Sequence, residues 1–115
     1  MPLVKISIKK GRLPSEKRQL LDIVHSSLVE AFKIPDHDRI QRIYEFKQDE
    51  FEIPGDRTDK YTIIETTVFP GRSLEAIGYL DNDTVIVLTE PELHNWGIRG
   101  GFPASEINIG FDLKV

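Results

Sequence analysis

The chain has 115 residues, of which 39% are hydrophobic and 30% charged, so its length and composition fit one globular domain covering residues 1–115. The formal net charge of −4 argues against a general nucleic-acid-binding protein, which would carry a basic surface, but it leaves room for a small anionic substrate held by a few arginines. The absence of cysteine excludes disulfides and thiolate chemistry and is compatible with the cytoplasmic location that we expect.

The N-terminal stretch MPLVKISIKKGR does not have the pattern of a signal peptide. It carries lysines where a signal peptide would have its apolar run. No other segment approaches the roughly 20 apolar residues that a membrane span requires. We therefore expect no membrane partner.

A strand followed by a helix is expected at the start of the chain. Residues 2–8 alternate apolar and polar side chains, which is the two-residue period of a half-buried strand. Gly11 ends the strand, and a helix follows from about residue 14 to residue 32. Its apolar stripe, spaced by three and four residues, is formed by Leu20, Leu21, Val24, Leu28, Ala31 and Phe32. Ile34-Pro35 stops the helix because a residue before proline avoids helical backbone angles.

Three more strands are expected after the helix. They span residues 39–46, 61–69 and 84–90, and the last two are rich in β-branched and aromatic side chains. Residues 47–60 are polar around Pro54-Gly55, which indicates a turn region. Residues 91–115 are rich in glycine and proline, with short strands expected near 107–113.

The order of these elements predicts an α/β (α+β) fold made of two β-α-β halves. Strands 2–8 and 39–46 flank a helix, as in a right-handed parallel crossover. Strands 61–69 and 84–90 should form a second such unit. Their connection, residues 70–83, is near the lower limit for a parallel crossover and has room for about one helical turn.

Four stretches of the sequence carry a resemblance to a known family. They are MPLVKISIKKGR, AFKIPDHDRIQRI, FEIPGDRTDKYTIIETTVFPGRS and HNWGIRGGFPASE. In this order, and covering most of the chain, they resemble the tautomerase superfamily and within it the branch of malonate semialdehyde decarboxylase. The resemblance implies a β-α-β fold, a homotrimer, and an active site in each subunit near the N-terminal proline.

Two features of the sequence depart from that family. The family has a full second helix after the Gly-Arg-Ser motif, whereas here SLEA is followed directly by IGYLDND. Either the helix has been lost, or a stretch is missing between Ala76 and Ile77. The decarboxylases also carry Arg-Pro-Arg at the end of the third strand, where this chain has FPGR at residues 69–72. The single arginine counts against decarboxylation and leaves proline-based chemistry open.

Pro2 is the expected working group, provided that Met1 has been removed. A free α-amine has a reference pKa of about 7.7–8.0, and burial or nearby cations disfavour its charged form. A neutral, rigidly held secondary amine can then act as a general base near pH 7. If Met1 is retained, the nitrogen is an amide, and Pro2 merely begins an edge strand.

Two further residues receive catalytic or binding roles from the resemblance. Arg72 would bind the substrate carboxylate, and its planar guanidinium suits a bidentate contact. The alternative for Arg72 is a surface residue at a helix start, where the helix dipole disfavours a cation. Asp38 matches the aspartate that orients or activates a water or a carbonyl, and its alternative is an ordinary turn residue.

The remaining candidates are less specific. Trp96 would wall the pocket or pack in the core or a trimer interface, and Arg99 would supply a second anion contact. Arg39 would begin the second strand as a surface charge, paired across subunits. The three histidines show no metal-ligand spacing, and His25, beside the apolar stripe, is expected to be packed. We expect no metal and no cofactor.

These residues predict tautomerisation or isomerisation of a small 2-keto or enol carboxylic acid, in which Pro2 moves a proton and Arg72 holds the carboxylate. One alternative is an activity like that of malonate semialdehyde decarboxylase, or a hydratase, in which a protonated Pro2 polarises a carbonyl or an alkene and Asp38 positions water. Another alternative is a non-catalytic trimeric binding protein, which retention of Met1 would favour.

Overall fold

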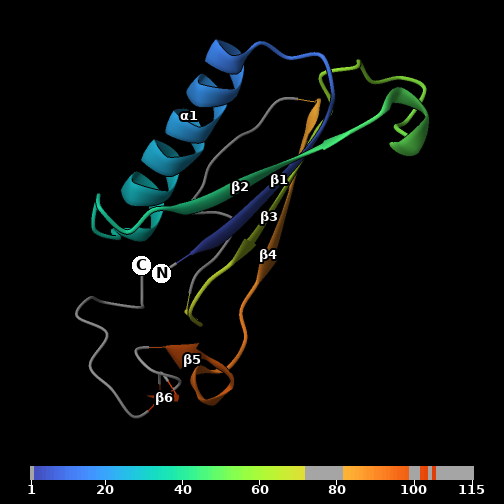
Figure 1. The fold of residues 1–115 in the computed structure, drawn as a ribbon. Coiled ribbons are helices and arrows are strands. Elements are labelled where there is room, and N and C mark those ends of the chain that lie inside the picture. Colours follow the sequence, from blue (N-terminus) through green and yellow to red (C-terminus); the bar gives the residue numbers. More distant parts are fainter. Residues whose placement is uncertain (1, 72–81, 99–101, 104, 106–115) are drawn as a thin grey trace.

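The computed structural model describes residues 2–71, 82–98, 102, 103 and 105. They form a four-stranded sheet in the order β2-β1-β3-β4, with α1 packed against one face (Figure 1). The bounds of these elements are Leu3–Lys9 for β1, Pro14–Phe32 for α1, Ile40–Phe46 for β2, Thr62–Thr67 for β3 and Thr84–Thr89 for β4. The predicted fold class and the predicted order of these elements are confirmed.

The sheet consists of two parallel pairs joined by one antiparallel pair. β1 and β2 run parallel, with Leu3 opposite Ile40, and α1 is the crossover between them. β3 and β4 also run parallel, with Thr62 opposite Thr84. β1 and β3 are antiparallel and hold the two halves together. The predictions about a short or missing second helix fall on residues 72–81, which lie outside the described residues.

Local signals in the sequence account for both ends of α1. At the start, the backbone N–H of Leu13 donates to Oε1 of Glu16 at 3.0 Å, and Pro14 is the first helical residue, where no N–H is needed. At the end, Lys33 adopts the left-handed conformation with a φ of 55°, and its N–H donates to the carbonyl of Val29 at 3.0 Å. α1 has 19 residues, yet no helix of the described part is both long and apolar enough to cross a membrane.

The core lies between α1 and one face of the sheet. The alternation predicted for the first strand is confirmed, because Val4, Ile6 and Ile8 are all fully buried under the helix. The predicted helical stripe provides the other side of this core. Its buried members are Val24, Leu28 and Phe32. Ile34, just beyond the helix, and Ile64 and Val68, in and after β3, complete this core.

The opposite face of the sheet carries exposed apolar side chains. Ile40 and Tyr44 on β2 and Val87 on β4 are large hydrophobic residues that remain substantially exposed in the single chain. α1 covers only the other face (Figure 1). A single subunit therefore leaves these apolar side chains exposed to solvent.

Shorter elements lie in the regions predicted as turns. η1, Gln48–Glu50, is a 3-10 turn within the predicted turn region, and η3 spans Leu93–Asn95. A two-residue hairpin formed by β5, Gly97–Ile98, and β6, Phe102–Pro103, was not predicted, because pairs this short leave no alternation to detect. The strands predicted near 107–113 lie outside the described residues.

We predict that Ile6→Ala lowers the free energy of unfolding by about 2–5 kcal/mol, because it leaves a cavity under α1. Ile6 is 0% exposed, whereas Ile23 on the outer side of α1 is 56% exposed. Ile23→Ala is therefore the control and should change stability by about 0.5 kcal/mol or less. Urea denaturation at one fixed protein concentration measures both variants, and equal losses would contradict the assignment of the core.

Candidate active site

Strand pairing brings Pro2 and Asp38 to the same end of the sheet. Because β1 and β2 are parallel and Leu3 lies opposite Ile40, the residues just before each strand are neighbours. Pro2 therefore lies beside Arg39, and Asp38 is one residue further from the strand. The resemblance assigned roles to both Pro2 and Asp38, and their proximity follows from the register.

The second half of the sheet delivers Trp96 to this end as well. β3 is antiparallel to β1 with Thr67 opposite Leu3, so the chain after β3 continues toward the position of Pro2. β4 is parallel to β3 and ends at the same side, and the chain beyond β4 leads to β5 (Figure 1). Trp96 immediately precedes β5. The rings of Phe69 and Trp96 pack with their centroids 4.8 Å apart. One end of the sheet thus collects residues from all four strand termini.

Pro2 and several apolar residues at this end of the sheet are buried. Pro2 itself is buried, and so are Val68, Phe69 and Trp96. The indole Nε1–H of Trp96 donates to the carbonyl of Pro91 at 3.1 Å, so its polar atom is satisfied by the chain. Burial in such surroundings disfavours a charged amine. Trp96 is thus a buried, packed residue at this end of the sheet, and its role as a wall of the pocket stays a prediction.

Asp38 lies in the short connection between α1 and β2. Its backbone N–H donates to the carbonyl of Pro35 at 3.0 Å, which forms a tight turn, and the residue is half-buried. The turn explains why the pattern of proline followed by aspartate occurs here. The role predicted for the Asp38 carboxylate stays a prediction.

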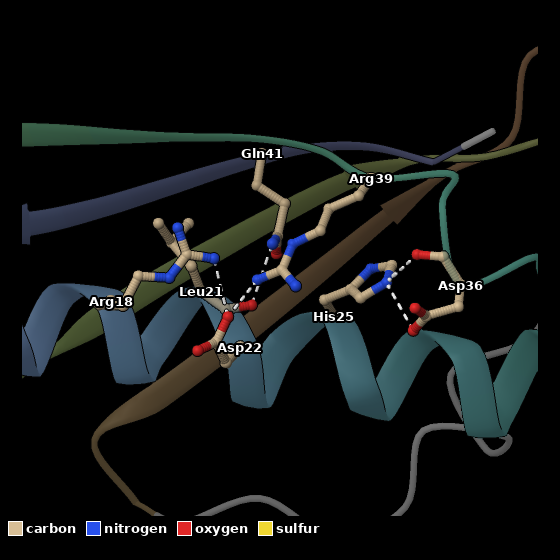
Figure 2. Close-up of polar contacts among 7 residues, drawn as sticks. All are labelled: Arg18, Leu21, Asp22, His25, Asp36, Arg39 and Gln41. Carbon is tan, nitrogen blue, oxygen red and sulfur yellow. Dashed lines mark hydrogen bonds and ion pairs between the residues drawn. The ribbon is translucent and has the colours of Figure 1, made fainter.

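Arg39 is paired within its own chain. A guanidinium nitrogen of Arg39 donates to Oδ1 of Asp22 on α1, and Arg18 donates to the same oxygen at 2.8 Å (Figure 2). The hydrogen bond from Arg18, followed by that from Arg39, lowers the pKa of Asp22 to about 2. Arg39 therefore connects α1 to the start of β2, and the pairing that we considered across subunits is not needed to satisfy it.

Two other contacts from α1 reach the same connection. Nε2 of Gln41 donates to the carbonyl of Leu21 at 2.9 Å, and Nε2 of His25 lies 2.7 Å from the carbonyl oxygen of Asp36 (Figure 2). His25 is buried, as predicted from its position beside the stripe. The sequence reasoning did not identify Asp22 or Gln41. The only signal for them in the sequence is that Asp22 lies three residues before His25 on α1 and Gln41 lies two residues after Arg39.

A second group of polar contacts lies at the other end of the sheet. Arg12 donates to the carbonyl of Lys60 at 2.6 Å and to Oγ1 of Thr62 at 2.8 Å. Thr58 donates through its hydroxyl and backbone N–H to Asp83, and these bonds lower the pKa of that carboxyl. These contacts hold the loop before β3 and lie far along β1 from Pro2.

Other predicted site residues cannot be placed. Arg72 and Arg99 lie outside the described residues, although Gly71, the residue before Arg72, is within them. Among the described histidines, aspartates and glutamates, no three or more converge as a group that could hold a metal ion.

A family model described as "Tautomerase enzyme" matches residues 2–61, which is 60 of the 115 residues. The chain belongs to the tautomerase family. The match includes Pro2, Asp38 and the contacts of α1, and it ends before Trp96. The resemblance that the sequence motifs carry is therefore confirmed at the level of the family.

Individual relatives and solved structures agree with this assignment. The chain is 32% identical over 72 residues to "Probable tautomerase YrdN" of Bacillus subtilis (strain 168), a match that spans 58% of this chain and 56% of that protein. It is also similar to FG41 malonate semialdehyde decarboxylase inhibited by 3-bromopropiolate, at 25% identity and a TM-score of 0.73, covering 86% and 90% of the two chains. A fused 4-OT symmetric trimer shares the fold at 18% identity and a TM-score of 0.74, covering 90% and 96%.

We predict that Asp22→Asn makes the stability of this protein less sensitive to acid. The folded-state pKa of Asp22, about 2, lies below the ordinary value of 3.8. Its contribution to stability is therefore complete above about pH 4 and is lost as the pH falls toward 2. Thermal unfolding between pH 5 and pH 2 should decline less steeply in Asp22→Asn than in wild type. Asp49→Asn, at an exposed position in η1, is the control and should keep the wild-type slope.

Proposed function

We propose that this tautomerase catalyses the tautomerisation or isomerisation of a small 2-keto or enol carboxylic acid, with the amine of Pro2 as general base. The observation that carries the proposal is the burial of Pro2 at the sheet end that also holds Asp38 and Trp96. Membership of the tautomerase family supports the reaction class. The proposal requires removal of Met1, because only a free N-terminal amine can accept a proton.

The proposed reaction moves one proton within the substrate. Pro2 takes the proton from the enol oxygen, and the protonated amine then returns it to the carbon, so the base is regenerated. Arg72 holds the carboxylate through its planar fork, and Arg99 provides a second contact to the anion. The apolar surroundings, with Trp96 as a wall, keep the amine neutral before the transfer. Asp38 orients the substrate carbonyl or a water beside Pro2.

We also propose that the tautomerase is a cytoplasmic homotrimer. The similar fused 4-OT structure is a trimer. The exposed apolar side chains of Ile40, Tyr44 and Val87 lie on the sheet face that α1 leaves uncovered. A second and third copy would bury this face.

Decarboxylation or hydration of a three-carbon acid is a second candidate, favoured by the 25% identity to malonate semialdehyde decarboxylase and by the position of Asp38. In that case a protonated Pro2 would polarise the carbonyl or alkene, and Asp38 would position water. The single arginine of the FPGR stretch counts against decarboxylation. Release of carbon dioxide from malonate semialdehyde would decide in its favour. Retained Met1 in the native host, seen by intact mass, would instead favour a non-catalytic binding protein.

Pro2→Ala should reduce kcat/KM for ketonisation of the phenylpyruvate enol by about 100-fold, the lower range for losing a positioned general base. The variant keeps a small second residue, so Met1 is still removable, but it replaces the rigid secondary amine. Pro54→Ala, in the exposed turn before β3, is the control and should keep full activity. Undiminished turnover by a Pro2→Ala protein of confirmed N-terminal mass would refute the proposal.

Arg72→Ala should raise KM for the same acid about 10-fold or more, because the carboxylate loses a charge-assisted bidentate contact. The KM of Arg72→Lys should lie between those of Arg72→Ala and wild type, since an ammonium group retains the charge but cannot make the bidentate contact of a guanidinium group. Arg57→Ala is a control, because Arg57 contacts Asp56 in the loop at the other end of the sheet. Steady-state kinetics measure all three, and an unchanged KM in Arg72→Ala would remove Arg72 from the site.

A further inference from the structure

The segment formed by residues 36–41 is attached to α1 by three separate contacts. The Arg39 guanidinium binds the Asp22 carboxylate, the Gln41 amide donates to the Leu21 carbonyl, and His25 bonds to the Asp36 carbonyl (Figure 2). The three contacts come from successive positions along one side of the helix. They hold both ends of the 36–41 segment against a rigid element.

His25 makes the contact nearest to the turn before Asp38. Its Nε2 lies 2.7 Å from the carbonyl oxygen of Asp36, and a carbonyl oxygen can only accept, so Nε2 must carry the hydrogen. The carboxylate of Asp36 is also 3.5 Å from Nε2, but the Asp36 side chain is 95% exposed while that of His25 is 4% exposed. The main-chain bond is thus the shorter contact of the buried imidazole.

Asp38 lies between the fixed points of this segment. Asp36 is held by His25 on one side, and Arg39 is held by Asp22 on the other. The backbone N–H of Asp38 closes a turn on Pro35 at 3.0 Å. The turn has few conformations left once both neighbours are bound to α1. The contacts of Asp36 and Arg39 with α1 therefore restrict the main chain from which Asp38 extends.

We propose that His25 is a positioning residue that places Asp38 beside Pro2 by fixing the main chain at Asp36. The proposal rests on the proposed function, in which Asp38 orients a carbonyl or a water next to the amine. His25 acts through the backbone and does not touch substrate. Small displacements of a catalytic group can cost as much as about 100-fold in rate, which gives such a contact a measurable effect on kcat.

The first experiment compares two substitutions that differ in one hydrogen bond. His25→Gln retains an N–H donor at a similar reach, whereas His25→Leu fills the site without a donor. We expect kcat for the enol acid to fall about 10-fold in His25→Leu with KM nearly unchanged, and to recover in His25→Gln. Equal activity of His25→Leu and wild type, both folded by circular dichroism, would overturn the proposal.

Asp36→Ala is the matched control for the carboxylate. It removes the exposed side chain and keeps the carbonyl that His25 contacts, so its kcat should equal that of wild type. If Asp36→Ala lowers kcat as much as His25→Leu does, the effect comes from the pair between His25 and the Asp36 carboxylate. That result would overturn the proposal that His25 acts through the Asp36 carbonyl.

A double-mutant cycle with Asp38→Asn shows whether His25 acts through Asp38. If it does, His25→Leu lowers kcat in the wild-type background and adds little in the Asp38→Asn background. Equal losses in both backgrounds would show an independent effect and overturn the proposal.

Amide hydrogen exchange provides a readout that does not depend on activity. The Asp38 N–H should exchange about 10-fold faster in His25→Leu than in His25→Gln or Asp36→Ala, because the turn on Pro35 is then less restrained. Unchanged exchange in His25→Leu would overturn the proposal even if activity fell. If Pro2→Ala keeps full turnover, the proposed function fails, and the exchange result alone decides whether His25 fixes the segment.

Discussion

The parallel pairing of β1 with β2 is the constraint on which the candidate site depends. Placing Leu3 opposite Ile40 makes the residues before the two strands neighbours, although 37 positions separate them in the chain. A slip of one residue would turn Val4, Ile6 and Ile8 away from α1, because successive strand residues face opposite sides. The free energy of burying these side chains therefore maintains the register, and the register places Pro2 beside the turn of Asp38.

The antiparallel pairing of β1 with β3 extends this arrangement to the second half. Because β3 ends where β1 begins, the stretch from Val68 to Gly71 arrives at Pro2's end of the sheet. β4 then delivers Trp96 to the same place, against Phe69. β1 thus positions residues of the candidate site through both of its neighbours, the parallel strand β2 and the antiparallel strand β3. The packed rings of Phe69 and Trp96 therefore lie at the same end of the sheet as Pro2, the candidate proton-transfer residue.

Two groups of polar contacts lie at opposite ends of the sheet. At the Pro2 end they connect α1 to the 36–41 segment, and the shared Asp22 carboxylate has its pKa lowered because two guanidinium groups donate to it. At the other end they hold the loop before β3 through Arg12 and Thr58. Contacts of the first kind restrict a candidate catalytic turn, and contacts of the second kind stabilise a loop remote from it.

The sequence by itself determined the four strands of the main sheet, the helix with both of its ends, and the β-α-β order, because alternation, helical spacing and the proline after the helix act over a few neighbouring residues. It did not determine the short pair β5-β6. Pro2 and Asp38 were also found at this level, through motifs that resemble the tautomerase family. Only the tertiary structure decided that these two residues share one end of the sheet and that Arg39 pairs with Asp22. Sheet register and contacts between α1 and β2 join residues far apart in the chain, and their free energy exists only when the core is assembled.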